Sequence, residues 1–206
     1  MRLTALAAIL LLCSAGRAGA QAAEGDHETW SFYASAYTYL VPDDDDYLQP
    51  TFAADRGWLH LEGRVNYEDL DTGSAWIGYN LSVGDELALE ITPMLGVVFG
   101  NTTGIAPGYK GSLGWRWLEL YSESEYVVDT EESDESFLYT WSELTVAPAD
   151  WWRGGLVVQR TKVYDTAFDI QRGLLAGVTL GRVDLTAYVL NPDEDTTVVL
   201  AVGVGF

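Results

Sequence analysis

From residue 30 onward, hydrophobic and polar residues alternate in twos along most of the chain. The clearest stretch is WLHLEGRVNYE, residues 58–68. Its apolar set is Leu59, Leu61, Gly63, Val65 and Tyr67, and its other set is Trp58, His60, Glu62, Arg64, Asn66 and Glu68. Because successive side chains of a strand point to opposite faces, this pattern predicts a strand with one apolar face and one ionisable face.

The same period recurs in twelve segments with turn residues between them. The predicted strands are 30–41, 47–54, 58–68, 75–83, 86–99, 105–113, 115–128, 136–147, 151–164, 169–180, 183–191 and 196–206. Segment 105–113 is the weakest, because Pro107 and several glycines disfavour a strand, so ten strands is the alternative count.

The connections alternate in kind. Tight turns fall at 55–57, 84–85, 113–114, 148–150 and 181–182, and longer, mostly acidic loops fall at 42–46, 69–74, 101–104, 129–135, 165–169 and 191–195. This order predicts an up-and-down antiparallel meander with short turns on one rim. A soluble β-sandwich also alternates, but it generally needs Greek-key connections. An all-β, single transmembrane β-barrel fits better, because a membrane requires a closed sheet whose apolar face meets lipid and whose polar face lines the lumen.

The N-terminal residues predict export. Arg2 precedes an apolar run over 3–12 and an A-x-A cleavage pattern at 18–20, which is typical of a secretory signal peptide. We expect a signal peptide over 1–20, with a second cleavage site after residue 22, a short periplasmic segment over 21–29 and the barrel over 30–206. Cys13 leaves with the signal peptide, so the barrel has no disulfide.

Composition narrows the partners. The chain has 31 acidic and 11 basic residues and a formal net charge of −20, which argues against a nucleic-acid partner. Its tryptophans fall near the ends of predicted strands, as in the aromatic girdles at membrane interfaces. They are Trp30, Trp58, Trp76, Trp115, Trp117, Trp141, Trp151 and Trp152.

The last nine residues, VVLAVGVGF, place Val198, Leu200, Val202, Val204 and Phe206 on one face. With this ending and the signal peptide, the chain resembles bacterial outer-membrane β-barrel proteins over its whole mature length. The resemblance implies a place in the outer membrane of a Gram-negative bacterium, with both termini periplasmic. It also implies that the barrel-assembly machinery recognises Phe206 and that the partners are outer-membrane lipid and lipopolysaccharide. It indicates no subfamily.

Charged residues are expected to line the lumen. The inner faces of the predicted strands carry Glu62, Arg64, Glu90, Glu119, Glu123, Glu143 and Asp184. Arg160 and Lys162 share one face of segment 151–164, which can be read with either face inward or with a bulge that switches it. Because a lipid-facing Arg or Lys at mid-bilayer costs about 2–4 kcal/mol, we expect both to point inward or to lie above the hydrocarbon.

These residues favour a narrow, porin-like channel for small polar or cationic solutes. The alternative is a non-conducting barrel with a structural or interaction role, in which Arg64, Arg160 and Lys162 pair with carboxylates and plug the lumen. Barrels of about eight strands are filled by side chains, whereas those of 16–18 are open, so twelve strands lies between the two.

Catalysis and a dedicated metal site are not expected. Only His27 and His60 offer an imidazole, and no nucleophile is spaced to use either one. The acidic run at 43–46 lacks the alternating donors of a calcium loop. We therefore predict no cofactor and no metal site, with divalent cations bound loosely at the acidic loops.

Overall fold

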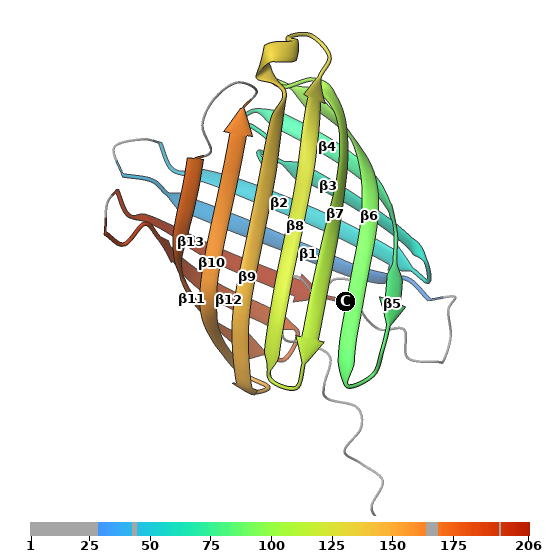
Figure 1. Ribbon diagram of the computed structural model, residues 1–206, viewed down its shortest axis with the longest axis vertical. Helices are drawn as coiled ribbons and strands as arrows, with labels where there is room; N and C mark the ends of the chain where they lie inside the picture. The colour runs from blue at the N-terminus through green and yellow to red at the C-terminus, as the bar shows by residue number, and fades with distance from the viewer. Residues whose placement is uncertain (1–28, 43–44, 164–168, 194) are drawn as a thin grey trace, which may run out of the picture.

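The computed structural model describes residues 29–42, 45–163, 169–193 and 195–206. Apart from one 3₁₀ turn, η1 (Ser133–Glu135), its regular structure is all β (Figure 1). The strands are β1 (Ser31–Leu40), β2 (Tyr47–Arg56), β3 (Leu59–Val65), β4 (Thr72–Tyr79), β5 (Leu81–Val83), β6 (Leu87–Gly100), β7 (Gly104–Trp115), β8 (Leu118–Asp129), β9 (Phe137–Ala149), β10 (Trp152–Val163), β11 (Asp169–Leu180), β12 (Val183–Leu190) and β13 (Thr197–Gly205).

The strands form one closed antiparallel barrel. Each strand pairs with the next one along the chain, except that β4 pairs with β6 and not with β5, and β1 pairs with β13. Since β5 also pairs with β6, β4 and β5 share one position, and the ring has 12 strand positions. The predicted up-and-down barrel of twelve strands is confirmed.

Alternation along each strand separates a wet interior from an apolar exterior. On β6, the outward side chains Leu87, Leu89, Ile91, Leu95, Val97 and Phe99 are all exposed. On β3, the inward His60, Glu62 and Arg64 are all buried. A soluble protein rarely exposes so large a contiguous apolar surface, whereas a barrel in lipid requires it.

The third and fourth predicted strands differ from the observed ones in detail. β3 ends at Val65, because Asn66 adopts a positive φ of 55°, which interrupts the alternation. Tyr67, expected on the apolar face, therefore turns into the lumen. The predicted strand 75–83 is interrupted at Asn80. The Asn80 side chain donates a hydrogen bond to Asp55 on β2 and accepts one from Thr92 on β6.

The weakest predicted strand is present and longer than expected. β7 pairs continuously with β6 through Pro107, which lies opposite Leu95. On its other side, the register with β8 has no partner for Ala106 or Pro107. Pro107 thus falls where the ladder with β8 is interrupted, so the residue's missing N–H is tolerated.

The two rims of the barrel differ. One, here the turn rim, has the tight turns before β3, β8, β10 and β12 and holds the C-terminus, where Phe206 and Phe32 exchange backbone hydrogen bonds. The other, the loop rim, has the longer connections, including η1 at the top of Figure 1. Residues 1–28, with the predicted signal peptide and cleavage sites, lie outside the described residues. In the described part, no helix is long and apolar enough to cross a membrane.

Most tryptophans lie at the turn rim, and all those there are exposed: Trp30, Trp58, Trp115, Trp117, Trp151 and Trp152. The girdle prediction was wrong for the other two. Trp76 and Trp141 are only 3% and 4% exposed and point into the lumen. Both residues lie at inward-facing positions in the middle of a strand. There the indole ring fills space in the lumen and does not mark a membrane interface.

Candidate functional site: the barrel lumen

A network of ion pairs crosses part of the lumen at mid-height. Arg64 on β3 donates to Glu62 on the same strand and, at 2.7 Å, to Glu125 on β8. Lys110 on β7 donates to Glu62 and lies 3.9 Å from Glu123. β3 and β8 are four positions apart around the ring. The contact between Arg64 and Glu125 therefore crosses the interior of the barrel and does not run between neighbouring strands.

Aromatic rings enclose the guanidinium of Arg64. Its Cζ lies 4.2 Å from the centroid of the Tyr67 ring and 4.5 Å from that of the Trp76 ring. Gly96 on β6 makes room for the indole, because a Cβ there would lie 2.5 Å from Trp76. Cation–π contacts strengthen when the cation is desolvated, and Arg64 is only 4% exposed. Arg64 is therefore fixed in place by charge and by packing.

A second polar cluster gathers around Glu143 on β9. Its carboxylate accepts from Arg153 at 3.0 Å, from the Trp141 indole at 2.9 Å and from the Tyr188 hydroxyl at 2.9 Å. Arg153 also donates to Thr186 at 2.8 Å. Each polar group of this cluster is thus hydrogen-bonded, as buried charges require.

Tyr67 reaches across the lumen. Its hydroxyl donates to Glu123, and its ring meets Tyr139 on β9 edge-on, with centroids 5.5 Å apart. The segment after β3 and strand β9 are on nearly opposite sides of the ring. Tyr139 also packs against both buried apolar clusters, one containing Val127 and the other Val199. Aromatic and apolar side chains therefore constrict the half of the lumen nearer the loop rim.

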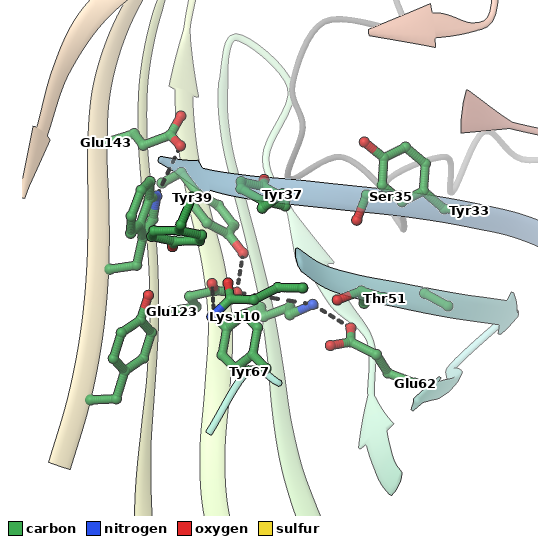
Figure 2. A pocket seen from close by; sticks show the side chains of 15 residues that line it. Tyr33, Ser35, Tyr37, Tyr39, Thr51, Glu62, Tyr67, Lys110, Glu123 and Glu143 are labelled. Atoms are coloured by element: carbon green, nitrogen blue, oxygen red, sulfur yellow. Dashed lines mark hydrogen bonds and ion pairs between the residues drawn. The ribbon is translucent and has the colours of Figure 1, made fainter. Parts of the chain in front are cut away.

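Between these groups lies a cavity of about 60 Å³ (Figure 2). Tyrosines and carboxylates dominate its lining: Tyr33, Tyr37, Tyr39, Tyr67, Tyr121, Tyr139, Glu62, Glu123 and Glu143. One water needs about 10–15 Å³ of such space, so the cavity has room for several waters. The Tyr33 hydroxyl and one oxygen of Glu125 have no partner within the described part of the chain, and water would satisfy them.

The structure places the predicted lumen residues unevenly. Glu62, Glu123 and Glu143 line the cavity, and Arg64 adjoins it through Glu62. Glu90, Glu119 and Asp184 share the inward parity but lie nearer the turn rim and away from the cavity. Asp184 accepts from Thr179 at 2.7 Å, and Glu90 accepts from Ser112 at 3.2 Å.

Arg160 and Lys162 do not point into the lumen. Arg160 pairs across with Thr140 and Ile170, which share the outward parity, and its side chain is exposed. Lys162 has the same parity two residues further on. A register shift between β9 and β10 does occur, but it lies at Trp152–Gly154, near the turn rim. It therefore does not change the facing of Arg160 and Lys162, which lie at the other end of β10 and point outward.

Several charged lumen residues were missed, among them Lys110, Arg153 and Glu125. Lys110 lies in the strand judged weakest, and Arg153 follows a Trp pair at a bulge, where parity is unreliable. Glu125 could have been found, because it continues the inward series of Glu119 and Glu123 on one strand.

His60 is a buried lumen histidine, as expected. Its Nδ1 lies 2.8 Å from Asp55 and its Nε2 lies 3.1 Å from Glu62. Both ring nitrogens face carboxylates, so neither is placed to take a proton from a nucleophile. His27 lies outside the described residues. Among those described, no group of His, Asp and Glu is arranged to hold a metal ion.

No family model matches the sequence, and no curated protein matches it either. Solved structures do match in fold. A KdgM porin superposes with a TM-score of 0.61 at 10% identity, covering 84% of this chain and 99% of its own. A KdgM porin in complex with disordered oligogalacturonate gives a TM-score of 0.58 at 10% identity, covering 85% and 99%. The chain has the fold of these porins.

Proposed function

We propose that this protein is an outer-membrane channel of narrow bore for small polar or cationic solutes. The observation that carries the proposal is a cavity of about 60 Å³, ringed by tyrosines and carboxylates, inside a closed barrel with an apolar exterior. The porin fold of the neighbouring structures supports a channel over a catalytic role.

The charge of the lumen supports the preference for cations. Carboxylates outnumber cations on the inward face: the acids are Asp55, Glu62, Glu68, Glu90, Glu119, Glu123, Glu125, Glu143 and Asp184, and the bases are Arg64, Lys110 and Arg153, with His60 beside them. Low-dielectric walls focus this excess negative potential along the lumen. Oligogalacturonate, the ligand of one neighbour, is an acidic sugar. An acidic lumen disfavours such a polyanion, so we propose neutral and cationic solutes instead.

The difference between the two rims supports a proposal for the orientation of the barrel. We propose that the turn rim, with the C-terminus and the exposed tryptophans, faces the periplasm and that the acidic loop rim faces outward. In known barrels of this type the short turns are periplasmic and the long loops extracellular. Loosely bound divalent cations at the acidic loops would link that rim to anionic lipopolysaccharide.

A non-conducting barrel is the second candidate. It is favoured by the contact of Tyr67 with Tyr139, whose rings meet across the lumen on the loop side. In that case the ion pairs of Arg64 and Arg153 would serve stability alone. Conduction separates the two functions directly.

Liposome swelling tests the proposal with solutes of matched size. Purified barrel is reconstituted into liposomes and exposed to glucose, cationic glucosamine or anionic glucuronate. We expect swelling with glucose and glucosamine and much slower swelling with glucuronate. No swelling above that of protein-free liposomes would establish the non-conducting barrel, and faster swelling with glucuronate would refute the acidic selectivity.

A further inference from the structure

The exterior of the barrel carries one basic patch near the loop rim. The patch consists of Arg160 and Lys162 on β10 and Arg172 on β11. Arg160 lies opposite Ile170, so Arg172 is its diagonal neighbour, about 7–8 Å away, and Lys162 is two residues along the same strand. Three cationic side chains thus gather on one outward face.

The position of this patch is unusual for the chain. Every other Lys or Arg in the described part lies inside the lumen or at the turn rim: Arg64, Lys110, Arg153, Arg56, Arg116 and Arg182. The connections at the loop rim are mostly acidic. The patch is therefore the one basic surface on this half of the described exterior, and its net attraction is for anions.

The two cations on β10 lie at and just below the outer edge of the apolar band. Trp152 marks the opposite interface on the same strand. With a rise of about 3.3 Å per residue and a tilt of about 40°, Arg160 lies roughly 20 Å above Trp152 and Lys162 roughly 25 Å. The apolar band of such barrels is about 25 Å tall. Lys162 therefore lies at the outer edge of this band and Arg160 about 5 Å inside it, a distance that a long arginine side chain spans when it extends its guanidinium toward the lipid phosphates.

Arg160 and Arg172 differ in how freely their guanidinium groups can bind an anion. Arg160 makes no hydrogen bond or ion pair with any residue in the described ranges, and its guanidinium presents a fork suited to a phosphate. Arg172 lies 3.4 Å from Asp193, and both are well exposed, so this pair is weak.

We propose that this patch binds the phosphate groups of an anionic glycolipid of the outer leaflet, with Arg160 as the main contact. The proposal rests on the proposed outer-membrane location and orientation but not on conduction. Direct phosphate binding here differs from cation bridging at the acidic loops, because it needs no divalent ion.

Native mass spectrometry of the folded barrel, in the presence of chelator, tests the site. The probes are bis-phosphorylated lipid A and its dephosphorylated form. The test variant is Arg160→Gln/Arg172→Gln, and the matched control is Arg116→Gln/Arg182→Gln at the turn rim. Each cation near an anionic lipid surface contributes roughly a fivefold gain, so we expect the test variant to retain about 25-fold less lipid A. The control should retain lipid A like the wild type. The heat-dependent gel shift checks folding.

Several results would overturn the proposal. They are no retention of lipid A by the wild type, equal retention of the dephosphorylated lipid, or equal losses in both double variants. Displacement of lipid A by excess inorganic phosphate would mean that the patch binds free phosphate. A dimer that disappears only in the test variant would assign the surface to a second copy of the chain. The comparison of the two lipids uses the wild type, so it stands even if a variant does not fold. Swelling assays are independent of all these outcomes.

Discussion

Replacing Arg64 by methionine should destabilise the barrel strongly. Arg64 is the buried cation between Glu62 and Glu125, and it lies 3.7 Å from Glu68. Methionine keeps an apolar stem between Tyr67 and Trp76 but removes the charge. Lys110 and His60 still pair with Glu62, so the stranded group is Glu125, which has no other cation within reach in the described lumen.

The magnitude follows from the burial of that carboxylate. Breaking a buried ion pair from one side costs about 3–5 kcal/mol, because the remaining charge is left uncompensated. We expect the free energy of unfolding of Arg64→Met to fall by this amount. Adding Glu125→Gln removes the stranded charge, so Arg64→Met/Glu125→Gln should recover part of the loss even though it carries one more substitution.

Urea titration in lipid vesicles, followed by the gel shift of the folded barrel, measures both variants. Arg116→Met is the matched control, because Arg116 and Glu86 are 3.7 Å apart and largely exposed, and such pairs contribute about 0–1 kcal/mol. An Arg64→Met barrel that unfolds at the wild-type urea concentration would refute the reasoning. So would a double variant less stable than the single one. Either result would mean that the network is solvated and carries little of the stability.

Three further predictions follow from the fold. A peptide tag inserted at 131–132 should be labelled on intact cells and one at 148–150 should not; the reverse pattern would invert the proposed orientation. Deleting Phe206, which stacks on Phe32 with centroids 5.7 Å apart, should slow membrane insertion and lower the yield of heat-shifted barrel; a normal yield would show that the terminal ring is dispensable. Tyr67→Ala removes the ring that meets Tyr139 and should raise single-channel conductance, whereas unchanged conductance would place the constriction elsewhere.

Strand existence and facing could be predicted from the sequence because the barrel imposes a two-residue period wherever lipid and lumen differ. The simplest case is β3, where the sequence predicts one apolar and one ionisable face. The structure has this arrangement, with Leu59, Leu61 and Val65 outward and His60, Glu62 and Arg64 inward. The prediction fails where the backbone leaves the regular strand. Asn66, with its positive φ, turns Tyr67 inward, and no pattern in residues 58–68 indicates that turn.

The candidate site was only partly predictable for a related reason. Parity identifies which carboxylates face inward, but the pairing of Glu62 with Lys110 or of Arg64 with Glu125 depends on which strands meet across the lumen. The facing of Arg160 was ambiguous, because Gly154 and Gly155 weaken the alternation at the start of β10. Because Arg160 faces outward, a place above the hydrocarbon is the alternative that is left, and it stays a prediction.

The reversal potential of single channels in a salt gradient tests most directly whether the lumen is an acidic conducting path. In planar bilayers we predict small, cation-preferring currents in the wild type. Replacing Glu62, Glu90 and Glu123 together by glutamine should reduce that preference. The preference should also fade at high salt, because the screening length falls from about 10 Å at 0.1 M to about 3 Å at 1 M. A folded wild type that never conducts, or one that conducts with no cation preference, would contradict the proposed channel.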